Sequence, residues 1–410
     1  MRFFAVICLL ISLYLSLNGQ CDRLTMVEDY ERYFLGTQII NTTLNWNGDA
    51  NNCLPGQITA QARQMTLDRI NYYRRLAKLP TEVGFDDALT DMCQQAALMM
   101  HSNNELSHDP DSTWNCFSAD GRQAASRSNL ALGAHSSDAI ALYMIDPGAN
   151  NGPVGHRRWI LYSRAKDFGM GSTNRAHALY VINNKIPAPE NLDFIAYPGP
   201  GYFPAPLLPA RWSISVPKAN FENAEVILKD EDGNDLDFEV LPVKNGYGDN
   251  TLVWEVASDA INRFSEFDQT FFTTVNNINI GGQDTSFSYT VTVAPVSYPP
   301  LCQDGTTWME SQCSCQSQQT TASKQAEFQR LAITPNPADQ LLTIQLPSND
   351  FDAADGTMNF TLFDLAGKPV LRQVVEVTAP IDVQALPNGF YTAVVNRGKS
   401  NYYGKVVVKH

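Results

Sequence analysis

Two histidines and one acid are the residues of this sequence whose types and spacing could do chemistry. His108 follows Ser107 in a loop-like stretch, and His156 follows Gly155 in a second one, with Asp146 shortly before it. Imidazole nitrogens suit zinc, and two histidines with one carboxylate leave a fourth coordination position open for water. His108, His156 and Asp146 are therefore candidate zinc ligands, provided that the fold brings the loops to one cleft.

Two predicted helices lead to the first histidine. Apolar residues over 58–73 recur at near-helical spacing, and Pro80 lies where that helix must end, because proline cannot continue it. A second helix is expected after the acids at 86 and 87, which favour a helix start. It should fray near Asn103, which delivers His108 into the following loop.

A third, short helix leads toward the second histidine. It starts at Ser137-Asp138 and stops at Pro147-Gly148, just after Asp146. The stretches predicted as short strands are 159–161, 168–172 and 178–182, and the glycines at 169 and 171 suggest a bulge or close packing. Helices with a few antiparallel strands predict an α+β fold, here an α-β-α sandwich over residues 58–186.

Length and charge bound the class of protein. The chain has 410 residues, which predicts two to four domains, and its formal net charge of −14 opposes binding to nucleic acid. Residues 1–20 have the pattern of a secretory signal peptide, with Arg2 before an apolar run over 3–17. That run is too short to anchor the mature protein, and no other stretch is apolar for long enough, so no transmembrane segment is expected.

Export makes disulfides plausible among the eight cysteines, of which Cys8 leaves with the signal. The expected pairs are Cys21–Cys53, Cys93–Cys116, and Cys302 with either Cys313 or Cys315. Lipidation of the first mature cysteine is disfavoured, because Gln20 stands where a small residue is expected.

The second half of the chain is predicted to be all-β. Prolines crowd the start of 187–298, and alternating apolar residues further on predict a β-sandwich, with a hairpin whose acidic tip is 230–235. Residues 299–328 read as a linker, and 329–410 as a last, small β-sandwich with turns at Ala366-Gly367 and Asn388-Gly389. Residues 21–57 remain as a polar, loop-like N-terminal extension.

Residues 66–184 resemble the CAP superfamily of cysteine-rich secretory, antigen 5 and pathogenesis-related proteins (the SCP domain), and most of all its bacterial branch. The matching blocks are Asn71-Tyr72-Tyr73-Arg74 with Leu79-Pro80, Ser107-His108, Asn129-Leu130-Ala131, Tyr143-Met144-Ile145-Asp146, and Gly155-His156 with Trp159. The resemblance implies an α-β-α sandwich with a central cleft. Taken alone, the spacing of Asn71 and Arg74 indicates a solvated helix face. The resemblance instead implies that both residues are buried polar groups of the scaffold.

The resemblance also implies a set of cleft residues. Many family members line the cleft with two histidines and two acids that can hold zinc. His108 and His156 match the histidines, Asp146 takes the place of one glutamate, and Ser128 stands where the second is often found. The cleft candidates are therefore His108, Ser128, Asp146 and His156.

Residues 331–410 resemble the C-terminal sorting domain of the type IX secretion system of Bacteroidota. The matching blocks are Pro335-Asn336-Pro337, Asp364-Leu365-Ala366-Gly367, and Leu386 with Asn388-Gly389-Phe390-Tyr391 before a basic end. The resemblance implies export by the Sec signal and then by the type IX machinery, which would recognise this tail. The expected location is extracellular or on the cell surface.

Three functions are compatible with these residues and motifs. The first is a non-catalytic binding module whose His-lined cleft takes a lipid, glycan or protein, and Ser128 in place of a carboxylate favours it. The second is a zinc-assisted hydrolase using His108, His156 and Asp146, although the sequence has no His-Glu-x-x-His or Gly-x-Ser-x-Gly motif. The third is a surface adhesin acting through the middle β domain. Enzymatic activity is left open, with the non-catalytic hypothesis preferred.

Overall fold

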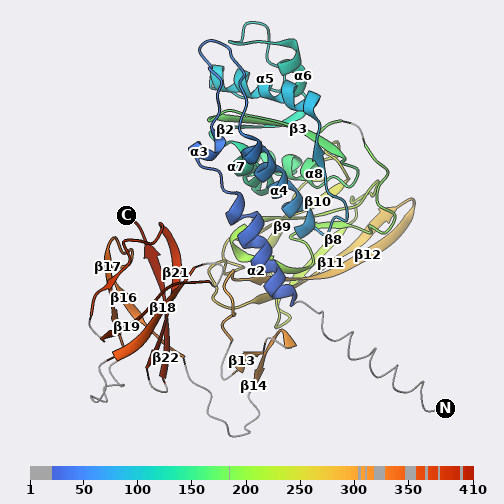
Figure 1. Cartoon of the computed structure of the whole chain (residues 1–410). Coiled ribbons are helices and arrows are strands. Elements are labelled where there is room, and N and C mark those ends of the chain that lie inside the picture. The colour runs from blue at the N-terminus through green and yellow to red at the C-terminus, as the bar shows by residue number, and fades with distance from the viewer. Residues whose placement is uncertain are drawn as a thin grey trace, which may run out of the picture. The chain divides into compact units, whose positions relative to one another are not determined.

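Four strands with helices on both faces form the part of the fold that holds His108 and His156 (Figure 1). In this computed structural model the sheet order is β1 (Gly84–Phe85), β3 (Asp167–Ser172), β4 (Ala176–Tyr180) and β2 (Ser128–Leu132). The structure describes residues 21–183, 185–302, 306–309, 312–317, 328–346, 357–364, 368–376, 379–397 and 400–410. They divide into two compact units, one up to residue 318 and one from residue 319.

The two faces of this sheet bury different residues because side chains alternate along a strand. On β2, Leu130 packs with α5 (Asp87–Asn103) and α6 (Ala119–Ala125), whereas Ala131 joins the cluster on the other face. That other face carries α4 (Ala60–Leu76), α7 (Ser136–Ile145) and α8 (Gly155–Ile160). The α-β-α sandwich expected for the family is therefore confirmed.

Glycines in β3 let α5 approach the sheet closely. A Cβ added at Gly169 would lie 2.5 Å from the backbone of Leu89, and one at Gly171 would lie 2.2 Å from the backbone of Cys93. Neither side chain could be accommodated without moving the helix. The close packing that the two glycines suggested is confirmed.

Local signals in the sequence start and end α4 and α5, so both predicted helices are confirmed. The Thr59 hydroxyl accepts a hydrogen bond from Ala62 N at 3.0 Å, and the Asp86 carboxylate accepts one from Leu89 N at 2.9 Å. At its other end α5 stops at Asn104, whose φ of 50° is left-handed.

Asn71 and Arg74 are buried, so the interpretation as scaffold groups is confirmed and a solvated helix face is excluded. The Asn71 side chain donates to Val83 O and accepts from Val83 N, at 3.0 and 2.9 Å. The Arg74 guanidinium donates to Ile160 O and Tyr162 O, at 2.8 and 3.1 Å. Burial lowers the pKa of Arg74 to about 10, which still leaves it charged at neutral pH.

The loop-like prediction for residues 21–57 is wrong, because α2 (Asp22–Tyr33), η1 (Leu35–Thr37) and α3 (Asn41–Leu44) lie within it. The side chain of Arg23 is fully buried and donates to the Asp268 carboxylate at 3.0 Å. Sparse apolar residues along α2 pack against the β domain, and that tertiary contact organises a segment whose local pattern is weak.

The strand predicted at 159–161 is also wrong, since residues 155–160 form α8. Arg157, which is fully buried, donates from Nε to Met144 O and from Nη1 to Arg211 O, both at 2.7 Å. These bonds tie the short helix to the end of α7 and to the β domain. Tertiary contacts therefore override the strand preference of a short apolar run. The predicted strands at 168–172 and 178–182 correspond to β3 and β4, the latter beginning and ending two residues earlier.

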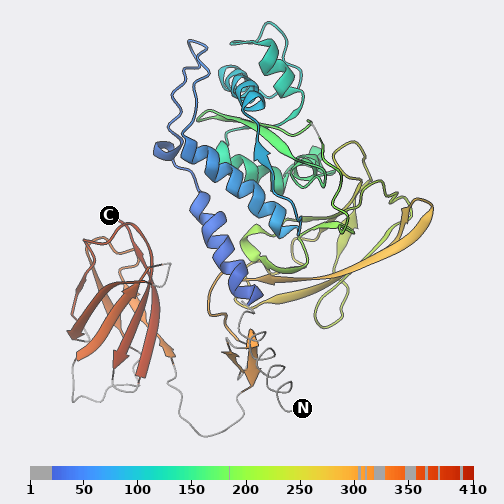
Figure 2. The same cartoon turned by 45° about the vertical axis from the view of Figure 1, so that its right-hand side comes forward.

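The β domain is a sandwich of two four-stranded sheets, as expected. One sheet orders β5 (Ile195–Tyr197), β7 (Arg211–Ser215), β10 (Thr251–Val256) and β9 (Phe238–Val240). The other orders β6 (Gly201–Pro204), β12 (Gln283–Ala294), β11 (Gln269–Ile280) and β8 (Glu225–Lys229). Figure 2 shows the long β11–β12 hairpin reaching out from this part of the fold. A short 3-10 helix, η3 (Ala205–Leu207), links β6 to β7.

The predicted hairpin around the acidic stretch 230–235 is confirmed at its turn, where Lys229 and Asp235 form an antiparallel bridge and Leu236 N donates to Leu228 O at 2.9 Å. Beyond the turn the two strands separate, since β8 pairs with β11 while β9 pairs with β10. Burial across the two sheets decides this pairing: Trp212 of β7 meets Phe271 of β11 edge to face, with ring centroids 6.0 Å apart. The same hydrophobic cluster continues from Trp212 to Ile70 and Ile160 of the sandwich. The α-β-α layer and the β domain therefore share one core.

Two of the expected disulfide pairs are wrong. The structure contains Cys53–Cys116 and Cys302–Cys315, the second being one of the two alternatives for Cys302. Cys93 faces the sheet from α5 and is fully buried, so it is directed away from Cys116. The described cysteines that form no disulfide are Cys21, Cys93 and Cys313. The predicted linker contains a small hairpin of β13 (Thr306–Met309) and β14 (Ser314–Ser317). The disulfide connects Cys315 in β14 to Cys302, which precedes the hairpin.

The second unit is the expected small β-sandwich. Its larger sheet orders β15 (Phe328–Arg330), β22 (Ser400–Val408), β21 (Gly389–Arg397), β18 (Thr357–Phe363) and β19 (Pro369–Glu376). Its smaller sheet orders β16 (Ala332–Thr334), β17 (Leu341–Gln345) and β20 (Ile381–Asp382). The predicted signal peptide, residues 318–327 of the linker and the turn at Ala366-Gly367 lie outside the described residues. Within the described chain, we find no helix with the length and apolarity needed to span a bilayer.

Candidate functional site

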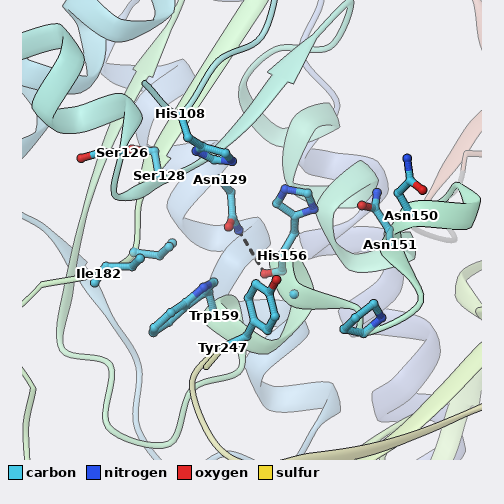
Figure 3. Close-up of a pocket in the computed structure, with 13 residues that line it drawn as sticks. His108, Ser126, Ser128, Asn129, Asn150, Asn151, His156, Trp159, Ile182 and Tyr247 are labelled. Carbon is cyan, nitrogen blue, oxygen red and sulfur yellow. Dashed lines mark hydrogen bonds between the residues drawn. The ribbon is translucent and has the colours of Figure 1, made fainter. Parts of the chain in front are cut away.

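A pocket of about 300 Å³ opens beside α8 and brings the two histidines together (Figure 3). Its polar lining comprises His108, Ser126, Ser128, Asn129, Asn150, Asn151 and His156. The rest of the lining is Pro153, Gly155, Trp159, Val181, Ile182 and Tyr247. Three of the four predicted cleft residues therefore line one cavity, and the fourth, Asp146, lies behind His156.

His156 is held from behind by Asp146. Its Nδ1 lies 2.7 Å from Asp146 Oδ1, and its backbone N–H donates to Asp146 Oδ2 at 3.0 Å. Asp146 is 1 % exposed and adopts a left-handed conformation, φ 51°, at the end of α7. With Nδ1 donating to the carboxylate, Nε2 is the ring nitrogen that His156 offers to the pocket.

His108 lies at the mouth of the pocket and is held by the backbone. Its Nδ1 is 2.8 Å from the carbonyl oxygen of Ala125, at the end of α6. A carbonyl oxygen only accepts, so Nδ1 donates and Nε2 keeps its lone pair for a ligand. The loop carrying His108 is also tied to α6 through Asp109, whose carboxylate accepts from Arg122 Nε at 2.8 Å.

Asn129 and Tyr143 complete what we call the inner wall, which consists of Asn129, Tyr143, Asp146 and His156. The Asn129 amide donates to His156 O at 3.0 Å, and the Tyr143 hydroxyl donates to Asn129 O at 3.0 Å. The Tyr143 ring stacks on His156 with centroids 5.5 Å apart. Three side chains, those of Asn129, Tyr143 and Asp146, thus hold His156 in place.

Beneath the inner wall lies His177, which is fully buried. Its Nδ1 is 3.1 Å from the Tyr143 hydroxyl, and burial lowers its pKa to about 3. This imidazole is therefore neutral under ordinary conditions, and it supports the pocket without lining it.

Ser128 enters the lining as a buried hydroxyl, 4 % exposed. Its Oγ lies 3.7 Å from Sγ of Cys93, and burial raises the pKa of that thiol to about 12. Cys93 therefore remains protonated, and it supplies no thiolate to the site.

The opposite side of the pocket, here called the outer wall, consists of Trp159 and Tyr247. Figure 3 shows the two rings beside each other, across the pocket from His108. Tyr247 belongs to the loop 241–250 of the β domain, between β9 and β10. A Cβ at Gly155 would lie 2.9 Å from the Tyr247 ring, so the small residue before His156 makes room for it.

Arg158 and Asp249 hold the loop 241–250 in place. Arg158 donates to Lys244 O at 2.6 Å and to Asp249 O at 2.9 Å. The Asp249 carboxylate accepts from the Ser163 N–H at 2.9 Å and from its hydroxyl at 3.1 Å. Burial raises the pKa of Asp249, against the lowering effect of these bonds.

Sequence reasoning gave no sign of Tyr247 as a pocket residue, because it comes from a segment outside the CAP resemblance. Trp159 and Asn129 did stand within the matching blocks, although neither was singled out for the cleft. The second acid that many family members have in the cleft, where this chain has Ser128, has no replacement in the described lining: Glu105 and Asp109, the acids on either side of Ser107-His108, do not line this pocket.

The predicted zinc set is only partly assembled. Both histidines direct Nε2 to the same pocket, but both oxygens of Asp146 are engaged with His156. Among the described residues, no three His, Cys, Asp or Glu side chains are grouped so that they could hold a metal ion. Asp146 thus fits the role of orienting an imidazole better than that of a third ligand.

Two family models match the chain. The model of the cysteine-rich secretory protein family, CAP, matches residues 67–183, and that of the secretion system C-terminal sorting domain matches residues 332–409. The first match contains all four predicted cleft residues. No curated protein matches the sequence.

Similar solved structures include the N-terminal four immunoglobulin domains of Dscam1 isoform 4.44, at 15 % identity and a TM-score of 0.14, covering 46 % of this chain and 38 % of that one. The periplasmic chaperone SfaE is 12 % identical, with a TM-score of 0.15, over 54 % and 94 %. Dimeric latent PorU from Porphyromonas gingivalis is 15 % identical, with a TM-score of 0.14, over 48 % and 18 %. The chain thus spans less than half of the first of these.

The sandwich with its two-histidine pocket and the separate β-sandwich at the C-terminus coincide with the two matched segments. The sorting domain indicates export by type IX secretion, the system of Bacteroidota, to the cell surface or the extracellular space. This chain therefore carries a CAP domain of the cysteine-rich secretory protein family followed by a type IX secretion sorting domain.

Proposed function

We propose that this exported protein is a non-catalytic binding module whose His-lined pocket takes an extracellular ligand. The observation that carries the proposal is how the acid next to His156 is used. Both oxygens of Asp146 are engaged with His156, so the described lining offers no free carboxylate, and its basic groups are the two imidazoles, whose Nε2 atoms can accept a hydrogen bond from a ligand. The pocket can therefore present hydrogen-bonding groups in fixed positions, which is what recognition needs.

Ser128 supports the same proposal. A serine acts as a nucleophile when an adjacent base accepts its proton. Its Oγ has the Cys93 thiol beside it at 3.7 Å, and burial keeps that thiol protonated. Among the described residues, no imidazole is in hydrogen-bond contact with Ser128 Oγ, so the hydroxyl has no adjacent base and is suited to hydrogen bonding.

The zinc-assisted hydrolase remains a second candidate because of one observation. Both histidines use Nδ1 internally and leave Nε2 for the pocket, which is the arrangement of imidazoles that bind metals. A zinc ion would supply Lewis-acid chemistry when bound. His108 and His156 would hold it, and Asp146 would orient His156.

The adhesin hypothesis is altered by the position of Tyr247. The loop 241–250 of the β domain lines the same pocket as the histidines, and the two domains share one core. We infer that the β domain acts together with the CAP domain and not as a separate binding module.

The test is a thermal-shift screen of the full chain against soluble glycans, lipid micelles and peptides, with His156→Ala alongside. At least one class should raise the melting temperature of the wild type and not that of the variant. His410→Ala, in the sorting domain, is the matched control and should behave as the wild type. Mass spectrometry of the bound compound after prolonged incubation should find it unchanged.

Two results would overturn the proposal. If no class stabilises the wild type through His156, the pocket is not a binding site. If a product forms in a His156-dependent manner, the protein is an enzyme. Titration calorimetry with zinc chloride on the wild type, His108→Ala and His156→Ala then decides the hydrolase hypothesis, which requires stoichiometric binding that both variants lose.

A further inference from the structure

Resting on the proposed function, we infer that the ligand of this pocket is a neutral sugar and that the β domain selects it through Tyr247. Three properties of the pocket favour such a ligand: its charge, its hydrogen-bonding groups and its aromatic wall. None of them depends on a metal ion.

The described lining contains no aspartate, glutamate, lysine or arginine. Charged groups beside the lining have partners of their own: Asp146 is enclosed behind His156, and Arg158 donates to Lys244 O and Asp249 O. The Lys244 ammonium, outside the lining, lies 5.7 Å from the centroid of the Tyr247 ring. Phosphates and carboxylates are normally bound by arginine or lysine, and ammonium groups by carboxylates. The pocket offers neither, so it suits a ligand without formal charge.

The polar groups that do line the pocket both donate and accept. Asn151 donates from its amide to Pro147 O at 2.7 Å, which leaves its amide oxygen for a ligand. Asn150 lies next to it in Figure 3, and the two imidazoles each offer Nε2. Hydroxyl groups pair with such mixed sets because each hydroxyl is donor and acceptor at once. A ligand rich in hydroxyl groups is therefore favoured.

The outer wall supplies a flat apolar surface opposite these polar groups. Trp159 and Tyr247 are each half-buried and lie side by side across from His108. The C–H face of a pyranose ring packs on such a surface while its hydroxyls point outward to polar groups. A volume of about 300 Å³ is at the small end of ligand pockets, which suits a sugar ring better than an acyl chain.

Tyr247 is the element of this wall that the CAP domain does not provide. Arg158 and Asp249 fix its loop, and Gly155 lets the ring close over the start of α8. A change at Tyr247 should therefore alter which sugar binds without touching the inner wall. We assign it the role of a specificity-determining residue.

The experiment is titration calorimetry of the full chain with three neutral trisaccharides: chitotriose, maltotriose and mannotriose. Two charged counterparts accompany them, namely de-N-acetylated chitotriose, a cation, and trigalacturonic acid, an anion. At least one neutral compound should bind, and both charged ones should bind at least tenfold more weakly. Tyr247→Ala should weaken binding roughly tenfold, whereas Tyr247→Phe should stay within about threefold because it keeps the ring.

Phe264→Ala is the control, since Phe264 is 93 % exposed, belongs to the same unit and does not line the pocket. The inference is overturned if no neutral trisaccharide binds, if the charged compounds bind equally well, or if Tyr247→Ala binds as the wild type does. Its failure is distinct from that of the proposed function. Lipids or peptides that stabilise the protein through His156 would keep the binding module and exclude the sugar.

Discussion

His156 and Tyr247 line the same pocket, but different parts of the chain hold them in different ways. His156 is fixed within the CAP domain by a buried carboxylate at 2.7 Å and by the stacked ring of Tyr143. Tyr247 is carried on a loop of the β domain, whose backbone carbonyls accept from Arg158. The inner wall thus lies within the segment that the CAP model matches, whereas the outer wall combines Trp159 of that segment with Tyr247 from a loop outside it.

Because buried side-chain hydrogen bonds hold His156, we expect substitutions in the inner wall to lower the free energy of unfolding more than substitutions around Tyr247 do. Asp146→Ala removes the acceptor of two His156 hydrogen bonds from a buried site and places alanine in a left-handed conformation. We expect the free energy of unfolding to fall by about 3 kcal/mol. Urea denaturation measures it. Asp146→Asn, which tolerates that conformation and keeps an acceptor, should lose roughly half as much. A loss close to zero in both variants would mean that the carboxylate orients nothing.

The residues that support the two walls should respond to pH with opposite signs. Burial puts the pKa of His177, under the inner wall, at about 3, below its usual value, so the unfolded chain binds more protons than the folded one between that value and pH 6.5. The neutral His177 therefore contributes stability that is present above pH 6.5 and is lost as the pH falls. Between pH 6.5 and 5 this amounts to about 2 kcal/mol.

Asp249, which holds the loop that carries Tyr247, has its pKa raised by burial, so its protonation on acidification stabilises the folded state. Urea denaturation of wild type, His177→Gln and Asp249→Asn across pH 7 to 4 separates the two contributions. His177→Gln should flatten the loss of stability on acidification, and Asp249→Asn should leave that loss as large or larger. An unchanged profile in His177→Gln would contradict the assignment.

The loop 241–250 should come loose when Arg158 is shortened. Arg158→Met keeps much of the aliphatic stem and removes the donors to Lys244 O and Asp249 O. We expect a loss of about 1–2 kcal/mol. Hydrogen exchange should rise at the amides of 244–249 and not at that of His156. Faster exchange at His156 as well would show that the walls are one cooperative structure.

The smallest predicted effect concerns Gly155, whose position next to His156 brings it against the Tyr247 ring. Gly155→Ala places a Cβ 2.9 Å from the Tyr247 ring, which opposes the gain in helix propensity at the start of α8. In a Tyr247→Ala background the clash is gone and the same change should become neutral or stabilising. A double-mutant cycle should give a coupling of about 1 kcal/mol. Additive effects would mean that the ring moves aside freely.

Much of this fold could be predicted from local signals. The helices α4 and α5 begin at side-chain caps, Thr59 and Asp86, that act within three residues, and the glycines at 169 and 171 report a close approach that any folded form must accommodate. The CAP and sorting domains were predicted because their motifs recur in order along the chain. The same motifs led to His108 and His156 and predicted that they share a cleft.

Other features depend on contacts between distant segments. Cys116 pairs with Cys53 and not with Cys93, because α5 directs the Cys93 side chain into the core. The helix α2 is stabilised by the ion pair between Arg23 and Asp268, a residue of the β domain. Asp146 matched a ligand position in sequence, yet only the fold could decide that its oxygens serve His156.

The sequence by itself therefore determined the layers of the sandwich, the two imidazoles and the route of export. The tertiary structure alone decided how Asp146 is used and that Tyr247 completes the pocket. The physical reason is the sequence separation over which each interaction acts. Caps, turns and periodic apolar faces depend on residues that are close together in the sequence. The partners of a buried charge and the wall of a pocket are set by whichever segments the shared core brings together.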